Sequence, residues 1–172
     1  MFEMVSILVG IALSLALFGV IFFFARPLYW GAPYAPSDER KIARMLALAN
    51  LKKNDHVVDI GSGDGKILIE LAKRGMNAAG YEINPILFHL SKINIRRKKL
   101  ERKIVVYKKN FWRVDLSSFD VVIVFGMPRI MGALEKKLQS ELRPGSRVVC
   151  NHFPFPSWRP NKVDEGVFVY VQ

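Results

Sequence analysis

The sequence is poor in cysteine and histidine, which limits the chemistry that it can support. Cys150 is the single cysteine among 172 residues, and the three histidines are His56, His89 and His152. One cysteine cannot form an internal disulfide, which fits a reducing compartment and excludes a disulfide-built scaffold. Cys150 lies inside a predicted strand without a Pro-Cys context, so we interpret it as a packing residue. The scattered histidines lack metal-ligand spacing, so we expect no metal site.

Charge is almost absent from the first 25 residues. This stretch contains Glu3 and no lysine or arginine, although the net charge of the whole chain is +11. A helix over the uncharged residues 4–25 would be long enough, at about 1.5 Å per residue, to cross the roughly 30 Å hydrocarbon layer of a membrane. We therefore predict a transmembrane helix in residues 1–25 and a linker in residues 26–36. A cleaved signal peptide is the alternative, but the stretch has no basic n-region and no clear A-x-A site follows it.

Basic residues begin directly after this stretch. Arg26, Arg40, Lys41 and Arg44 follow the predicted span, and nothing basic precedes it. The positive-inside bias then predicts a single-pass membrane protein whose C-terminal domain lies on the cytoplasmic side. A domain this basic suits anionic lipid, nucleic acid or an acidic protein as a partner. The sequence does not predict an oligomeric state.

Strand and helix patterns alternate through residues 37–172, which we predict to form one domain. Apolar runs such as VVIVF are typical of parallel strands buried on both faces, and the alternation implies right-handed crossovers. Ser37 is the predicted N-cap of the first helix, and Asn84 is that of a later helix starting at Pro85. The expected fold is a doubly wound, Rossmann-like α/β domain with a mostly parallel sheet. The predicted strands are 56–60, 77–82, 104–108, 121–125, 147–151 and 167–171, and the predicted helices are 38–50, 66–74, 85–99 and 130–142.

The loop DIGSGDGK follows the first predicted strand, at the sheet edge where doubly wound domains bind their ligands. A phosphate-binding P-loop is excluded, because Lys66 is followed by Ile67 instead of serine or threonine. The dinucleotide fingerprint G-x-G-x-x-G also fits poorly, because its third glycine falls one position after Gly65. The glycine spacing therefore favours a ligand other than a nucleoside diphosphate.

Acidic residues surround this loop. Asp59 and Asp64 put two carboxylates where a diphosphate would need neutral or positive surroundings. They suit a ligand that carries an ammonium group and no phosphate. Glu82 ends the next predicted strand, where it is placed to accept hydrogen bonds from both hydroxyls of a ribose.

Three motifs, VVDIGSGDGK, GYEINP and LRPGSRVV, together resemble the class I S-adenosylmethionine-dependent methyltransferases over roughly residues 37–151. The resemblance implies S-adenosylmethionine as the cofactor. By it, the loop backbone passes the methionine part, Asp59 holds the amino group, Glu82 binds the ribose and Asn110 meets the adenine amine. The cofactor-binding residues implied in this way are Asp59, Gly61, Ser62, Gly63, Asp64, Gly65, Glu82 and Asn110. The alternative is that the glycines only allow a tight strand-to-helix turn.

The flanking motifs resemble a narrower family. APYAPSDE, NFW, VFGMP, LEKKLQSEL and FPFPSW follow in the order found in the membrane-anchored protein-lysine methyltransferases that act on the ATP synthase c-subunit and the adenine nucleotide translocase. This similarity implies methyl transfer to lysine side chains of a membrane-associated protein, with lipid contacted through the anchor. Asn110 stands where that family has an acid, and His152 where it has an arginine. These two departures concern the adenine contact and the choice of substrate.

Methylation of lysine requires a neutral amine. The reference pKa of lysine is about 10.4, so the free amine at pH 7 costs about 4.6 kcal/mol, which an apolar aromatic channel lowers by desolvation. Aromatic side chains near predicted strand ends are Tyr34, Trp112, Phe125, Phe153 and Trp158. We expect Tyr34, Phe125, His152 and Phe153 to be the catalytic residues. Ordinary core packing is the alternative for each aromatic residue, and an ordinary loop position is the alternative for His152.

Other substrates and roles stay open at this point. The turn FGMP differs from the [ND]-P-P-[YF] turn of enzymes that methylate adenine, cytosine or glutamine, which argues against those substrates. A lipid-like small molecule is a second possible substrate, and a non-catalytic membrane-bound scaffold is a possible role. The basic stretch KINIRRKKLERK fits a solvated helix end first, anionic lipid second and RNA third, because it lacks the aromatic residues on which bases stack. Nucleic acid is therefore an unexpected partner.

Overall fold

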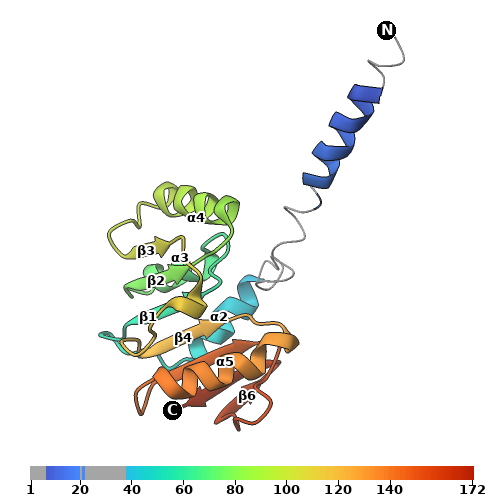
Figure 1. The fold of residues 1–172 in the computed structure, drawn as a ribbon. Coiled ribbons are helices and arrows are strands. Elements are labelled where there is room, and N and C mark those ends of the chain that lie inside the picture. The colour runs from blue at the N-terminus through green and yellow to red at the C-terminus, as the bar shows by residue number, and fades with distance from the viewer. Residues whose placement is uncertain (1–6, 20, 22–37) are drawn as a thin grey trace. The chain divides into compact units, whose positions relative to one another are not determined.

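The computed structural model describes residues 7–19, 21 and 38–172, which belong to two units that we treat separately (Figure 1). In the first unit, residues 7–19 and 21 are helical and their side chains are exposed. Within the described ranges, no helix is long and apolar enough to cross a membrane. The rest of the predicted span and the linker 26–36 with Tyr34 lie outside the described residues. The predicted cap Ser37 was wrong, because the N-cap of the first helix of the second unit is Asp38 and that helix begins at Glu39. The transmembrane helix stays a prediction.

The second unit is built on a seven-stranded sheet with the strand order β3-β2-β1-β4-β5-β7-β6. The first five strands in the sequence are parallel, whereas β7 runs antiparallel to β5 and β6 runs antiparallel to β7. The expected mostly parallel, doubly wound α/β sheet is confirmed. The strands are β1 Val57–Ile60, β2 Ala78–Tyr81, β3 Ile104–Tyr107, β4 Val121–Val124, β5 Arg147–Asn151, β6 Lys162–Asp164 and β7 Val167–Val171.

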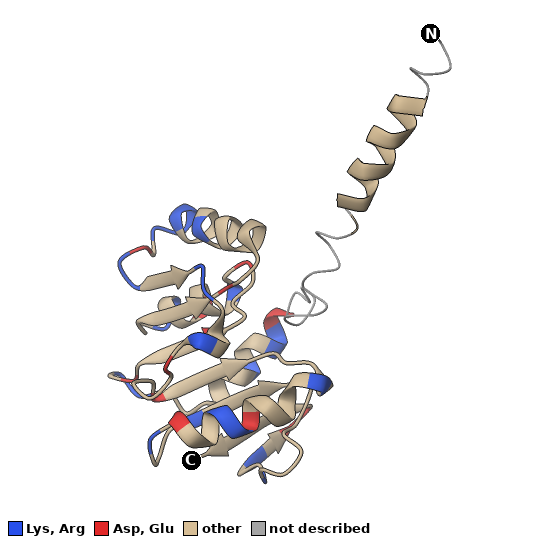
Figure 2. Cartoon of the chain, in the orientation of Figure 1, with Lys and Arg blue, Asp and Glu red and all other residues tan. Residues whose placement is uncertain are grey.

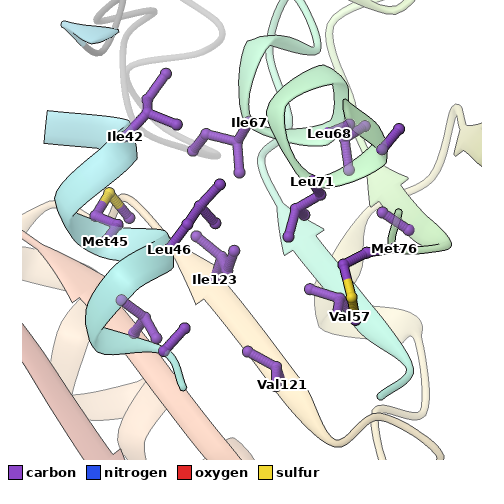
Figure 3. Close-up of a cluster of buried hydrophobic side chains, with 14 of the residues drawn as sticks. Ile42, Met45, Leu46, Val57, Ile67, Leu68, Leu71, Met76, Val121 and Ile123 are labelled. Carbon is purple, nitrogen blue, oxygen red and sulfur yellow. The ribbon is translucent and has the colours of Figure 1, made fainter. Parts of the chain in front are cut away.

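Helices cover both faces of this sheet and enclose two apolar cores. One core joins α2 (Glu39–Leu48) and α3 (Lys66–Lys73) to alternate residues of β1 and β4 (Figure 3). The other joins α5 (Pro128–Glu141) to the intervening strand residues. In β1 the successive residues Val57 and Val58 belong to opposite cores, as the two-residue period of a strand requires. This burial on both faces explains why the central strands are continuous apolar runs.

The fourth helix, α4 (Pro85–Arg97), lies beside the edge strand β3. Its predicted cap is confirmed, because Asn84 Oδ1 accepts hydrogen bonds from the backbone N–H groups of Ile86 and Leu87, at 2.9 and 3.4 Å. The predicted start of the last helix was wrong by two residues. That helix begins at Pro128, since proline lacks only an N–H that the first helical turn leaves unbonded.

Strand β6 was not predicted. It pairs with β7 through a tight hairpin whose two central residues, Glu165 and Gly166, have φ angles of 42° and 75°. Such a turn is usually marked by Asn-Gly or Asp-Gly, and glutamate at its first position gives no signal. Arg44 of α2 contacts this hairpin through Asp164, at 2.6 Å, and through Glu165, at 3.2 Å. A basic residue used above for membrane orientation is therefore engaged in an ion pair.

A buried ion pair joins the loop between α2 and β1 to the start of β5. Arg147 Nη2 lies 2.7 Å from Asp55 Oδ2, and the two side chains are 11% and 7% exposed. The same guanidinium donates to the carbonyls of Ala49, at 3.1 Å, and of Asn50. Asp55 also accepts a hydrogen bond from the backbone N–H of Lys52, at 2.6 Å. The pair thus fixes the connection between α2 and β1 against the sheet.

We expect Arg147→Ala to lower the free energy of unfolding by about 3–5 kcal/mol, because it leaves the Asp55 carboxylate buried without its partner. Urea unfolding of the full chain, followed by circular dichroism, measures this loss. The matched control is Arg143→Ala, which removes an exposed ion pair to Asp120, 59% and 38% exposed. That control should change stability by at most about 1 kcal/mol. Equal effects of the two substitutions would contradict the role given to the buried pair.

Candidate functional site

The glycine loop lies across the carboxyl end of β2. Gly61, Gly63 and Gly65 all have positive φ angles, 84°, 55° and 84°, which residues with a side chain rarely adopt. The backbone N–H groups of Gly61 and Ser62 both donate to the carbonyl of Tyr81, at 2.8 and 3.1 Å. The loop is therefore held tightly against β2 by its own backbone, and it presents little side-chain bulk to a ligand.

Glu82 links the residues that follow β2 to the glycine loop. Its Oε2 accepts a hydrogen bond from the N–H of Gly63, at 2.8 Å, and its Oε1 accepts one from the N–H of Asn84, at 2.7 Å. The side chain is only 6% exposed. Each carboxylate oxygen has two lone pairs, so each can still accept a hydroxyl hydrogen of a ligand. The residue expected to bind a ribose is thus also a structural link, which the sequence did not indicate.

Gly80 is a required residue that sequence reasoning missed. A Cβ atom at this position would lie 2.6 Å from Leu68 Cδ1 and 2.8 Å from Ser62 Oγ. Both distances are too short for real contacts, so only glycine lets β2, α3 and the loop approach one another here. Glycine inside a strand is a recognised signal of such a close approach, and AAGYE contains one.

Asp64 and Gly65 connect the loop to the two following helices. Asp64 Oδ1 accepts a hydrogen bond from the N–H of Lys66 in the first turn of α3, at 3.3 Å. The carbonyl of Asp64 accepts a hydrogen bond from the side-chain amide of Asn94 in α4, at 3.0 Å. A Cβ on Gly65 would lie 3.1 Å from Cβ of Ser91, also in α4. Helix α4 therefore supports the glycine loop directly.

Three buried carboxylates gather at the ends of β1 and β2. Asp59, Asp64 and Glu82 are 3%, 9% and 6% exposed. Burial, reinforced by the charges of Glu82 and Asp64, raises the pKa of Asp59 from 3.8 to about 8. Burial also raises the pKa of Glu82, against the lowering effect of its backbone hydrogen bonds. A cation between these groups would relieve their mutual repulsion, so the cluster suits a ligand with an ammonium group.

Asn110 has a structural contact where a cofactor contact was expected. Its Oδ1 accepts a hydrogen bond from the N–H of Trp112, at 3.1 Å, and caps a short 3-10 helix, Phe111–Arg113, that was not predicted. The Trp112 ring packs against that of Phe111, with centroids 4.9 Å apart. The expected contact of Asn110 with adenine stays a prediction.

The aromatic residues expected to form a channel separate into two groups. Phe125 follows β4 and Phe153 follows β5, and their ring centroids lie 6.3 Å apart. His152 has a positive φ of 76° and its ring lies edge-on to Phe153, with centroids 5.1 Å apart. Trp158 stacks on Phe155, with ring centroids 5.6 Å apart, and both Trp158 and Phe153 are half-buried against the α5 core. The structure thus brings together Phe125, His152 and Phe153 at the carboxyl ends of two adjacent strands.

Two residues without a sequence signal hold the loop that carries Phe153. The N–H of Phe155 donates to the hydroxyl of Tyr170, at 2.9 Å, and the N–H of Ser157 donates to Oε2 of the buried Glu135, at 3.1 Å. Burial raises the pKa of Tyr170 to about 12, so it stays protonated at physiological pH. These contacts fix Phe155 in the core and leave Phe153 at the strand ends.

A parallel sheet with a glycine loop and an acid cluster at its carboxyl edge defines a class I, Rossmann-like methyltransferase. Residues 59–162 match the family described as the ANTKMT methyltransferase domain. The chain is 40% identical over 136 residues to the ATP synthase c-subunit lysine N-methyltransferase of Xenopus laevis, covering 78% of this chain and 60% of that protein. The chain therefore belongs to the family of the ANTKMT methyltransferase domain.

Two further relatives align with this chain over more than nine-tenths of their own length. A protein-lysine N-methyltransferase of Saccharolobus islandicus is 36% identical, with 81% of this chain and 92% of that protein covered. The crystal structure of an RNA methyltransferase from Salinibacter ruber, in complex with S-adenosyl-L-homocysteine, is 30% identical, with a TM-score of 0.76 and coverage of 80% of this chain and 93% of that one. By contrast, the chain spans about six-tenths of the length of the vertebrate relatives that are named for the ATP synthase c-subunit.

The residues of the site fit S-adenosylmethionine, the cofactor of this family. Asp59 and the neighbouring carboxylates match its ammonium group, and Glu82 retains lone pairs for its ribose hydroxyls. The glycine loop offers close backbone approach next to carboxylates, which suits a cofactor without phosphate. When bound, the cofactor supplies an electrophilic methyl group on a sulfonium.

Proposed function

We propose that this protein transfers methyl groups from S-adenosylmethionine to lysine side chains of other proteins. Relatives that are 36–40% identical bear the names of protein-lysine methyltransferases. The observation that carries the proposal is the placement of Phe125 and Phe153, 6.3 Å apart, at the same sheet edge as the acid cluster. A cofactor site beside an apolar aromatic wall matches what methylation of an amine needs.

The aromatic pair has a defined part in this chemistry. A lysine ammonium that moves from water toward Phe125 and Phe153 loses hydration, which lowers its pKa and favours the neutral nucleophile. The ring faces still attract the approaching cation and the sulfonium. In-line displacement also requires that the site position the amine behind the methyl group and keep water out. In this proposal His152, which is exposed beside Phe153, orients the amine or accepts its proton.

The membrane is the proposed location of the substrate. Residues 1–25 form a single-pass anchor in this proposal, with the catalytic domain on the cytoplasmic side and a membrane protein as the methyl acceptor. The uncharged stretch 4–25 supports it, as do the names of relatives that act on the ATP synthase c-subunit and on the adenine nucleotide translocase.

RNA is a second candidate substrate. The relative of known structure from Salinibacter ruber is described as an RNA methyltransferase, and the net charge of +11 suits a polyanion. Against it, FGMP replaces the turn typical of enzymes that methylate base amines. A lipid-like small molecule stays a third possible acceptor.

The three candidate substrates can be distinguished by the fraction in which a radioactive methyl group is recovered. Detergent-solubilised protein is incubated with tritiated S-adenosylmethionine and host membranes or total RNA, and label is counted in protein, organic extract and RNA. Label in discrete protein bands supports the proposal. Label confined to the organic extract or to RNA would replace it with the corresponding alternative, and absence of transfer despite cofactor binding would favour a non-catalytic scaffold.

We expect Phe153→Ala to lower kcat/KM for the labelled protein about 10- to 100-fold, which is about 1.4–2.8 kcal/mol of transition-state stabilisation. Water then reaches the amine, so the pH at which the rate is half-maximal should also rise. Steady-state kinetics across pH measure both effects. Phe153→Leu keeps an apolar wall and should restore most of the rate. Equal losses in the two variants would contradict a role based on desolvation.

A further inference from the structure

Helix α4 carries apolar side chains on two opposite faces. Its inner face buries Ser91 and Ile95, and Ile95 packs in the same core as Ile104 of β3. Ile86, Leu90 and Ile93 are instead 55%, 37% and 46% exposed. Their i, i+4, i+7 spacing puts all three on one outer stripe of the helix, away from Ser91 and Ile95. A helix on a purely aqueous surface would carry polar residues along that stripe.

The end of the same helix is strongly basic. Residues 92–103 contain Glu101 and seven basic residues: Lys92, Arg96, Arg97, Lys98, Lys99, Arg102 and Lys103. Figure 2 shows this positive charge at one end of α4 and in the turn toward β3. In the part of the chain that the structure describes, none of the seven forms an ion pair within 4.0 Å. The positive charge is therefore not neutralised by the rest of the domain.

We propose that the outer face of α4, formed by Ile86, Leu90, Ile93 and the basic residues 96–103, docks onto the anionic lipid surface of a membrane. Aliphatic side chains enter the boundary between headgroups and acyl chains, and lysine and arginine reach the headgroup phosphates. Each basic residue near an anionic leaflet contributes about 1 kcal/mol. The outer stripe has no aromatic residue on which bases would stack, so RNA fits this surface less well.

Docking at this face would bring the cofactor site to the membrane surface. Asn84, which caps α4, donates its backbone N–H to Glu82, and Asn94 within α4 donates to the carbonyl of Asp64 in the glycine loop. This docking depends on neither the proposed anchor nor methyl transfer. Its test therefore measures whether α4 contacts lipid and does not measure enzymatic activity.

The test uses an environment-sensitive dye on a single new cysteine, because the native Cys150 is buried. Full-length Ile93→Cys is labelled and mixed with vesicles of phosphatidylcholine alone or with phosphatidylserine added. The control label is at Lys136→Cys, an exposed position on α5 over the opposite face of the sheet. We expect a blue shift of dye emission at position 93 with phosphatidylserine, and no shift at position 136.

A charge-neutral variant completes the test. Arg96→Gln, Arg97→Gln and Lys98→Gln in one protein should abolish the lipid-dependent shift at position 93 while cofactor binding, which reports folding, is retained. No shift with phosphatidylserine, an equal shift with both lipids, or an equal shift at position 136 would overturn the proposal. A shift caused by added RNA and not by phosphatidylserine would assign the surface to nucleic acid instead.

Discussion

Asp59→Asn should weaken S-adenosylmethionine binding about 100-fold or more without unfolding the domain. The substitution keeps the shape of a side chain that is 3% exposed but removes the charge that we expect to face the cofactor ammonium. Loss of one partner from a buried charge pair costs about 3 kcal/mol or more, which corresponds to about 100-fold in the dissociation constant. Isothermal titration calorimetry with S-adenosylmethionine or S-adenosylhomocysteine measures the change.

Apoprotein stability is the control for this variant. Asp59 resists ionisation because it is buried near Glu82 and Asp64, so an uncharged asparagine should leave the apoprotein at least as stable at pH 8 as the parent. Asp115→Asn, which changes an exposed acid between β3 and β4, should leave cofactor affinity unchanged. Retained affinity in Asp59→Asn would remove Asp59 from the cofactor site.

Cofactor affinity should rise about tenfold per pH unit below pH 8 and level off above it. The pKa of Asp59 is raised to about 8 by burial and by the neighbouring carboxylates, so the apoprotein holds this proton at neutral pH. An ammonium group in the site favours the carboxylate, so binding must release the proton, at about 1.36 kcal/mol per unit below the pKa. Titrations in buffers of different ionisation enthalpy count the protons released, and Asp59→Asn should release fewer.

The same shift gives the stability of the apoprotein a defined pH dependence. Because the pKa of Asp59 is higher in the folded chain than its ordinary value of 3.8, the folded state binds more protons between the two values. The contribution of Asp59 to the free energy of unfolding is fully present below pH 3.8, declines as the pH rises, and is lost above about pH 8. Saturating cofactor should reduce this decline. A cofactor affinity that does not change between pH 6 and pH 8 would contradict the raised pKa.

The sequence predicted the positions of the glycine loop and of Glu82 in the fold well, because local patterns carry that information. A strand, a glycine loop and a helix in succession predict the position of residues 59–66, and an acid ending the next strand predicts Glu82. The hydrogen bond from Gly63 to Glu82 joins residues 19 positions apart, so no local pattern contained it. Gly80 is required only because Leu68 and Ser62 approach it in three dimensions.

Long-range contacts also decide between the alternatives that the sequence left open. For Trp158 the alternative of core packing holds, because the hydroxyl of Tyr170 and the carboxylate of Glu135 hold its loop so that its ring stacks on Phe155. Tyr170 is far from this loop in the sequence, and it becomes a neighbour only because strand β7 pairs antiparallel with β5. The short strand β6 was missed because its turn, Glu165-Gly166, has a residue that ordinarily avoids positive φ.

Identification of the methylated residue shows whether this protein modifies lysine. Full-length protein and Asp59→Asn are each incubated with host membranes and S-adenosylmethionine carrying a deuterated methyl group, and peptides from the membranes are analysed by mass spectrometry. We expect deuterated methyl groups on lysine side chains with the parent protein, and their loss with Asp59→Asn. Label on residues other than lysine, or equal lysine labelling by the two proteins, would contradict this expectation.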